Sequence, residues 1–418
     1  MDGRRILILG LNFHPEPTST GKYTAELAAY LSARGHTIRV VTAPPYYPHW
    51  QVQTGYHARR YTRECWEGVD IYRCPLWVPR RPNGFTRLLH LSSFALSSLP
   101  VMIKQAGWKP DLVLCVAPTL LNAPAALLCA RFSGAQTWLH IQDFEVEAAL
   151  NLGLLPGGRA LARMAAGIER AVIDGFDHVS TISTRMMARL EVKHIPTAKR
   201  HLLPNWVDTH AIYPIDPSER RLRQELGFTD QQVVALYAGN LGHKQGLEIV
   251  LEAAKLLAGL AMIQFVICGD GAARVTLQSA AQGLSNLKFL PVQPRELLNE
   301  LLNLADIHLM PQKADAADLV MPSKLAGMLA SGKPVIATAL PHTGVGEIIS
   351  QVGVLIPPED AQAMAGAIRS LAAALDERQR LGAAGRAYAQ SHWERERVLS
   401  ELNDEIISWL EDFDTRGV

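Results

Sequence analysis

Short apolar runs alternate with amphipathic segments through the first half of the chain. Apolar and β-branched runs at 6–10, 37–42, 111–116 and 136–141 have the length of strands, and residues 179–182 form another. These runs are apolar at successive positions, which is typical of parallel strands that are buried on both faces. The segments between them have helical spacing. The pattern therefore predicts an α/β fold of alternating strands and helices.

The same alternation starts again after residues 201–208, HLLPNWVD, which have the character of a connection between domains. Further strands are expected at 233–239, 263–268, 287–290 and 306–310. We therefore predict two facing α/β domains, residues 1–204 and 205–390, with a ligand cleft between them.

A terminal segment, residues 391–418, follows the second domain. Val398, Leu402, Ile406 and Leu410 recur there at a spacing of four, which is one apolar stripe of a long helix from Ser391 to Phe413. Such a stripe needs a surface on which to pack.

Composition excludes several classes of protein. The 418 residues carry a formal net charge of +1, which argues against a nucleic-acid binder that depends on a strong basic field. The five cysteines form no C-x-x-C pair and indicate reduced thiols. No secretory signal is expected, since Arg4 and Arg5 lead directly into a strand-length run, and the uncharged run 88–103 is too short for a membrane-spanning helix.

One stretch combines a basic segment with an apolar one. The arginines of the basic segment are Arg59, Arg60, Arg63, Arg73, Arg80, Arg81 and Arg87. The run GFTRLLHLSSFALSSLPVMI begins at Gly84. A buried core helix is the more common explanation of such a run. The alternative is a peripheral helix that faces anionic lipid.

Residues 319–338 predict a helix with unusual chemistry at its start. Pro322 and Ser323 open the helix, and Gly332 and Pro334 end it before a short strand. Lys324 falls in the first turn, where the helix dipole disfavours a cation by about 0.3–1 kcal/mol. A bound phosphate or diphosphate would remove this conflict. A surface lysine beside an ordinary N-cap explains the pattern equally well.

Three other loops carry candidate chemistry. The loop NFHPEPTSTGK places backbone amides at a helix start but lacks the G-x-G-x-x-G fingerprint of dinucleotide enzymes. The segment 43–50, APPYYPHW, is either a rigid packed loop or a stacking surface for a ligand. His140, Gln142, Asp143 and Glu145 lie at or just after the carboxyl end of a strand, where α/β proteins bind ligands, although they also fit ordinary loop positions.

Six motifs in order resemble those of the retaining GT-B glycosyltransferases of family four, in particular the exopolysaccharide enzymes of the colanic-acid type. They are Pro15–Tyr23, Thr42–Pro48, Pro204–Asp208, Gly239–Glu248, Gly269–Gly271 and Pro322–Val335. The resemblance covers nearly the whole chain. It implies two Rossmann-like domains, the first binding the acceptor and the second the nucleotide sugar, with the terminal helix packing back on the first domain.

The resemblance also implies roles for individual residues. Those near the reacting groups are Asp143, His140, Lys244 and Lys324. Those at the donor are Gly21, Gly239, Asn240, Gly242, Gly269, Ser323, Asp318, Leu319, Val320 and Glu347. Those at the acceptor are Thr20, Lys22, Tyr46 and Tyr47. No cofactor or metal is expected, and the one D-x-D, at 412–414, lies in the tail.

The implied reaction is transfer of a hexose from a GDP- or UDP-sugar, GDP-fucose being one candidate, to a lipid-linked or saccharide acceptor. Relatives of this type work in the cytoplasm, peripherally at the inner membrane surface. The chain departs from the family where Gly327 and Leu319 replace its two glutamates, with Asp315 or Asp318 as substitutes for the first, and where Gln245 separates Lys244 from the loop glycine. A sugar-nucleotide epimerase of this architecture and a non-catalytic nucleotide-sugar-binding subunit are therefore the alternatives.

Overall fold

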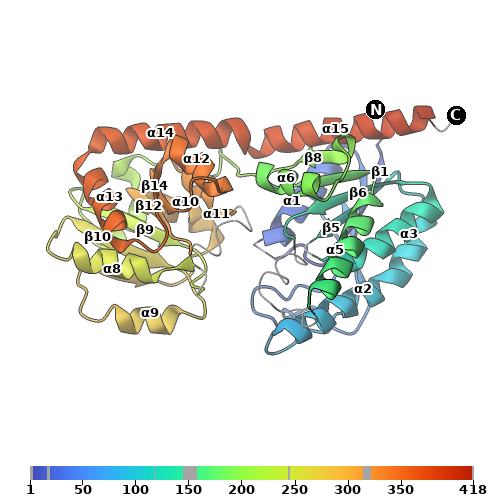
Figure 1. The fold of residues 1–418 in the computed structure, drawn as a ribbon, viewed down its shortest axis with the longest axis horizontal. Helices are drawn as coiled ribbons and strands as arrows, with labels where there is room; N and C mark the ends of the chain where they lie inside the picture. Colours follow the sequence, from blue (N-terminus) through green and yellow to red (C-terminus); the bar gives the residue numbers. More distant parts are fainter. Residues whose placement is uncertain are drawn as a thin grey trace. The chain divides into compact units, whose positions relative to one another are not determined.

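The structure is a computed structural model that describes residues 3–16, 19–117, 119–144, 158–242, 245–313 and 322–416. The chain forms two compact units (Figure 1). The first comprises Met1–Pro204 together with Leu399–Val418, and the second comprises Asn205–Val398. Each is built around its own sheet.

The first unit contains an eight-stranded sheet in the order β3-β4-β2-β1-β5-β6-β7-β8. The strands are β1 (Arg5–Gly10), β2 (Thr37–Thr42), β3 (Thr62–Trp66), β4 (Val69–Arg73), β5 (Leu112–Ala117), β6 (Gln136–Ile141), β7 (His178–Thr181) and β8 (Arg200–Leu202). All neighbours pair in parallel except β3 and β4, which form an antiparallel hairpin. Every residue of β5 and β6 is buried, as their uninterrupted apolar runs predict.

Helices cover this sheet (Figure 1). They are α1 (Ser19–Ala33), α2 (Gly84–Ala106), α3 (Ala123–Ser133), α5 (Gly158–Asp174) and α6 (Thr184–Val192). The side chain of Ser183 accepts a hydrogen bond from the Met186 amide and so caps α6. Within the described ranges, no helix is both long and apolar enough to cross a bilayer.

The second unit contains a six-stranded parallel sheet in the order β11-β10-β9-β12-β13-β14. Its strands are β9 (Val233–Ala238), β10 (Ile263–Cys268), β11 (Leu287–Leu290), β12 (Ile307–Met310), β13 (Val335–Thr338) and β14 (Val354–Ile356). Its helices are α7 (Arg221–Glu225), α8 (Glu248–Leu256), α9 (Arg274–Ala280), α10 (Leu298–Leu304), α11 (Lys324–Ala330), α12 (Gly344–Val352), α13 (Ala361–Ala373) and α14 (Leu375–His392). The predicted strands at 233–239, 263–268, 287–290 and 306–310 are confirmed to within one residue.

The terminal helix begins later than the sequence suggests. The stretch from Ser391 to Phe413 is not one helix, because α14 ends at His392 and α15 (Arg395–Arg416) begins after a break. At the break, the Val207 amide donates to the Trp393 carbonyl at 2.8 Å, and the Arg395 amide donates to the Val207 carbonyl at 3.0 Å. Val207, which is distant in sequence, therefore provides the hydrogen-bond partners of the backbone at the break between α14 and α15.

The apolar stripe of α15 is buried as predicted. Val398, Leu402, Ile406 and Leu410 are each 6% exposed or less. Farther along α15, the Gln136 side-chain amide donates to the Trp409 carbonyl at 2.9 Å, and the Trp409 ring stacks on His178 at 3.9 Å. This part of α15 is thereby attached to β6 and β7 of the first unit.

Candidate functional site

The loops that follow β9 and β10 are in direct backbone contact. The Gly239 amide donates to the Cys268 carbonyl at 3.0 Å, and the Leu241 amide donates to the Asp270 carbonyl at 2.9 Å. A Cβ on Gly269 would lie 1.9 Å from the Gly239 carbonyl oxygen, and both glycines have φ of +149°. Only glycine fits this crossing. The two loops thus form one floor at the carboxyl edge of the sheet, where parallel α/β sheets bind ligands.

Lys324 reaches across this floor from the first turn of α11. Its ammonium nitrogen lies 4.3 Å from the centre of the Tyr237 ring and 3.5 Å from Gln245 Oε1. Its Cδ lies 3.7 Å from the position that a Cβ on Gly239 would take. Burial of the ammonium lowers the pKa of Lys324 to about 7. The structure therefore holds the Lys324 ammonium between two neutral side chains and next to the backbone of Gly239.

The start of α11 differs in one respect from the sequence prediction. Ser323 occupies the N-cap position, but its side chain makes no capping hydrogen bond and the residue is exposed. The helix has only seven residues, so its dipole is short and contributes little. Attraction for an anion at this place depends mainly on the charge of Lys324.

Two other predicted donor residues, Asn240 and Gly242, belong to the floor itself, whereas Glu347 lies on a different helix. Asn240 and Gly242 follow Gly239 in the loop, and the Tyr237 hydroxyl donates to the Asn240 carbonyl at 2.7 Å. Glu347 is exposed in the first turn of α12. The predicted residues Lys244, Asp318, Leu319 and Val320, and the substitute Asp315, lie outside the described residues.

Three residues at this floor were not identified from the sequence. They are Tyr237, Gln245 and Lys313. Lys313 follows β12, and its Cγ lies 3.3 Å from the position of a Cβ on Gly246. The sequence signal that could have located Lys313 is its place directly after a strand, at the carboxyl edge that also carries Gly239.

In the first unit, the buried carboxylate of Glu16 connects the two loops that follow β1 and β2. Its Oε1 accepts hydrogen bonds from the amides of Tyr46 and Tyr47, each at 2.9 Å, and its Oε2 accepts one from Asn12 at 2.8 Å. A Cβ on Gly21 would lie 3.1 Å from Glu16, so α1 begins directly against this carboxylate. Burial raises the pKa of Glu16, while these hydrogen bonds favour the charged form.

The candidate acceptor residues have different environments. Thr20 is buried, whereas Lys22 is partly exposed and lies 3.7 Å from Glu26. Tyr46 is buried, with its ring 4.7 Å from that of His90. Tyr47 is partly exposed. Of the two tyrosines, Tyr47 is therefore the one with ring surface available to a ligand.

A hydrogen-bonded chain runs through the end of β6. The Trp138 indole donates to Ser180 Oγ at 2.7 Å, and Ser180 Oγ lies 2.8 Å from His140 Nδ1. The Gln142 amide nitrogen lies 2.8 Å from His140 Nε2. Burial lowers the pKa of His140 to about 3, so the imidazole is neutral. Since both ring nitrogens are engaged, His140 is arranged to orient Gln142, and partly exposed Asp143 follows directly.

The helix α2 exposes one apolar side and buries the other. His90, Phe94 and Met102 are buried. Its exposed large apolar residues are Phe85, Leu88, Leu89, Leu96 and Ile103. Arg80, Arg81 and Arg87, which flank its start, are also exposed. One side of α2 is thus buried in the core, while the contact of the exposed side with anionic lipid stays a prediction.

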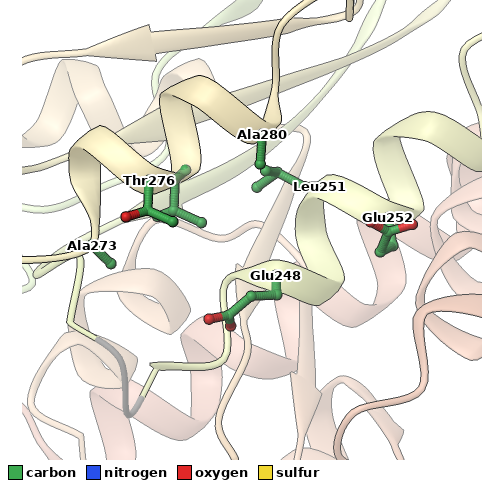
Figure 2. A pocket seen from close by; sticks show the side chains of 7 residues that line it. Glu248, Leu251, Glu252, Ala273, Thr276 and Ala280 are labelled. Atoms are coloured by element: carbon green, nitrogen blue, oxygen red, sulfur yellow. The ribbon is translucent and has the colours of Figure 1, made fainter.

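A small pocket between α8 and α9 is not large enough for a nucleotide. It has a volume of about 150 Å³, whereas ligand pockets typically have about 300–1,000 Å³. Figure 2 shows Glu248 and Leu251 on α8 facing Thr276 and Ala280 on α9. The arrangement is that of two packed helices.

Comparison with known proteins identifies the class to which this fold and site belong. Residues 19–206 match the family described as a glycosyl transferase 4-like domain, and residues 218–388 match the glycosyl transferases group 1. The chain belongs to the family-4-like GT-B glycosyltransferases, which confirms the resemblance and the fold predicted from the sequence.

Among relatives, the chain is 42% identical over 411 residues to WcaI of Escherichia coli, a protein named as a glycosyl transferase of colanic acid biosynthesis, covering 96% of this chain and 99% of that protein. It is 28% identical over 259 residues to a GDP-mannose-dependent mannosyltransferase of Corynebacterium glutamicum that acts on a monoacylated phosphatidylinositol monomannoside, covering 60% of this chain and 65% of that protein. The protein is therefore a glycosyltransferase.

Solved structures agree on the fold. Sucrose-phosphate synthase of Thermosynechococcus elongatus superposes with a TM-score of 0.76 at 17% identity, over 98% of this chain and all (100%) of that one. The Anabaena protein HepE, solved in complex with UDP, superposes with a TM-score of 0.69 at 14% identity, over 97% and 100% of the two chains.

Proposed function

We propose that this chain transfers a hexose from a GDP- or UDP-sugar to a lipid-linked saccharide, with retention of configuration and without a metal, in exopolysaccharide synthesis of the colanic-acid type. The observation that carries the proposal is Lys324, whose ammonium lies over the glycine floor at the carboxyl edge of the second sheet. The relative WcaI is named for colanic acid biosynthesis, and HepE has been solved with UDP and with UDP-glucose.

The proposed chemistry depends on the leaving group. As the bond between the anomeric carbon and the donor phosphate oxygen breaks, negative charge develops on the diphosphate. Lys324 neutralises part of that charge from a fixed position, with Lys244 and the Ser323 amide as further proposed donors. The bond to the acceptor oxygen forms on the same face of the sugar, and the hydroxyl proton leaves on the departing phosphate. Asp143 orients the acceptor hydroxyl, and His140 keeps Gln142 in place.

The acceptor would meet the first unit. Thr20, Lys22 and Tyr47 are the proposed contacts for its saccharide. The exposed apolar side of α2, flanked by Arg80, Arg81 and Arg87, suits the surface of an anionic membrane that carries a lipid-linked acceptor. We therefore place the enzyme in the cytoplasm, peripherally at the inner membrane surface.

The proposal is tested by binding and turnover of purified protein with GDP, UDP and their sugar conjugates, in the presence of EDTA. Lys324→Met should lower turnover about 100–1,000-fold, the usual effect of removing one fixed donor to the developing charge. Lys255→Met, at an exposed lysine that pairs with Glu252, is the matched control and should be neutral. The anomeric configuration of the product, read by NMR, reports retention. Full turnover by Lys324→Met, or none by the wild type in EDTA, would refute the corresponding part of the proposal.

A further inference from the structure

A second and larger cavity lies at the opposite edge of the second sheet. Its volume is about 580 Å³. It is lined by residues that directly precede parallel strands: Asp306 precedes β12, and Lys333 and Pro334 precede β13. The segment 214–217 and the start of α14 complete the wall. Because Gly239, Gly269 and Lys313 follow the carboxyl ends of strands, this cavity is separate from the proposed donor site.

Cations predominate in this cavity, which we term the amino-edge cavity. Arg220, Arg223, Lys333 and Arg378 line it. Asp306 accepts hydrogen bonds from Arg220 Nη1 at 3.3 Å and from Arg223 Nη1 at 2.8 Å. The two other lining carboxylates, Asp216 and Asp230, are exposed, and that of Asp216 is engaged by Ser218. Four cations thus line the cavity with three carboxylates, of which only Asp306 is not exposed. Arg223 and Arg378 also donate to backbone carbonyls, so Arg220 and Lys333 are the cations that an anion would mainly meet.

Several donors in the amino-edge cavity have no acceptor. Nε of Arg220 and Nε of Arg223 are buried without a hydrogen-bond partner. Lys333 is half-buried and makes no hydrogen bond or ion pair with the described residues. Burial and the charges of the three arginines lower the pKa of Lys333 to about 8, although the nearby Asp306 carboxylate acts in the opposite direction. Buried donors normally find partners, since leaving one unpaired costs about 1–3 kcal/mol.

We propose that the amino-edge cavity binds a phosphate group, either as inorganic phosphate or as the phosphate of a small phosphorylated molecule. A dianion supplies several acceptor oxygens at once and offsets the excess of cations that Asp306 leaves uncompensated. Guanidinium groups match phosphate geometry, and Lys333 adds a point charge. The volume of about 580 Å³ admits a phosphorylated monosaccharide as well as the free ion.

Calorimetric titration of the full chain with inorganic phosphate, and separately with a hexose 6-phosphate, tests this proposal. The titration is made in a Lys324→Met background, so that the proposed donor site does not contribute. Saturable binding is expected, and adding Lys333→Met should weaken it at least tenfold. Lys255→Met, which makes the same chemical change at an exposed position of this unit, should leave the affinity within twofold. Tighter binding of the sugar phosphate than of the free ion would identify a phosphorylated metabolite as the ligand.

A second variant and thermal melting distinguish the loss of a phosphate contact from misfolding of the protein. Arg220→Gln removes a different cation of the amino-edge cavity and should also weaken phosphate binding, while circular dichroism and the melting temperature of both variants stay close to those of the parent. Absence of saturable binding in the Lys324→Met background would overturn the proposal. So would equal affinities for the Lys333→Met and Lys255→Met variants. Neither result depends on whether the chain transfers a sugar.

Discussion

Two cations of this enzyme, the buried Arg73 and the half-buried Lys324, are accommodated in opposite ways. The Arg73 guanidinium donates to the carbonyls of His14 and Ala43 and to the Glu64 carboxylate, so its charge is satisfied within the fold. Lys324 has an aromatic face and one neutral amide at 3.5 Å. Removing the Lys324 ammonium from water costs free energy, and its contacts with Tyr237 and Gln245 offset only part of that cost. We infer that Arg73 supports the fold and that Lys324 serves a ligand.

The lowered pKa of Lys324 makes nucleotide binding dependent on pH. Burial disfavours the charged form, so the ligand-free protein loses this proton as the pH rises through about 7. A bound diphosphate favours the charged form, and its terminal phosphate is already ionised above a pKa of roughly 6. Affinity should therefore fall about tenfold between pH 8 and pH 9. Calorimetry at pH 8 in buffers of different ionisation enthalpy should show uptake of about one proton on binding.

Lys324→Met is the control for this prediction. The variant should bind the nucleotide more weakly, and the affinity that remains should change little between pH 8 and pH 9. If the wild type takes up no proton, or if the variant keeps the same dependence on pH, the diphosphate does not contact Lys324.

Replacing Arg73 tests its structural role. Arg73→Met leaves the His14 and Ala43 carbonyls without their donor, so we expect a loss of about 3 kcal/mol in the stability of the first unit. Arg63 lies on the neighbouring strand and pairs with Asp70, but its side chain is 59% exposed against 2% for Arg73. Arg63→Met should therefore cost at most about 1 kcal/mol. Urea denaturation of both variants measures the difference, and equal losses would contradict the assignment.

At the scale of elements, the sequence predicts those whose pattern is local. The buried strands β1, β5 and β6 follow from their continuous apolar runs. The hairpin of β3 and β4 was not predicted, because β3 reads as the charged, largely exposed stretch TRECW. Its turn consists of Glu67 and Gly68, both with positive φ, as in a type I′ turn, but without the usual Asn or Asp at the first position.

In the candidate site too, residues with a local sequence signal were predicted, and residues whose role depends on contacts distant in sequence were not. Lys324 was singled out because a cation in a first helical turn is visible in sequence, whereas the loop glycines were assigned to the donor through the family resemblance. Glu16 was not, because its role depends on a hydrogen bond to Tyr46, thirty positions away, and so on how two loops meet. The contact of Lys324 with Gln245 likewise joins residues separated by 79 positions, and no local pattern encodes it.

Attachment of α15 to the first unit can be tested with two adjacent isoleucines. Ile406 is fully buried, whereas Ile407 is partly exposed. Ile406→Ala should cost about 2–4 kcal/mol of stability, because it leaves a cavity under the helix. Ile407→Ala makes the same chemical change one residue along and should cost clearly less, in proportion to the smaller area that it buries. Thermal denaturation compares them, and equal losses would show that the stripe of α15 does not contribute as described.

At the scale of the whole molecule, the formal net charge of +1 conceals an uneven distribution. Exposed arginines gather between residues 59 and 87, directly before and at the start of α2. The same helix leaves Phe85 70% exposed and Leu96 72% exposed. Cations beside exposed apolar side chains suit the interface of an anionic bilayer, where both the charge and the apolar area contribute to binding. The low net charge is therefore compatible with the membrane-facing surface that we propose.

Charge reversal tests whether this surface, and not the net charge of the molecule, determines binding to anionic vesicles. The triple change of Arg80, Arg81 and Arg87 to Glu should sharply reduce sedimentation with vesicles that contain anionic lipid, since each basic residue near such a surface contributes about 1 kcal/mol. The matched control reverses three exposed cations of the second unit, Arg221, Lys255 and Arg369, so that the net charge changes equally. Leu96→Glu should weaken sedimentation too, because it removes apolar area. If the two triple variants sediment alike, net charge rather than the surface of α2 governs attachment, and the membrane-facing role of this helix is excluded.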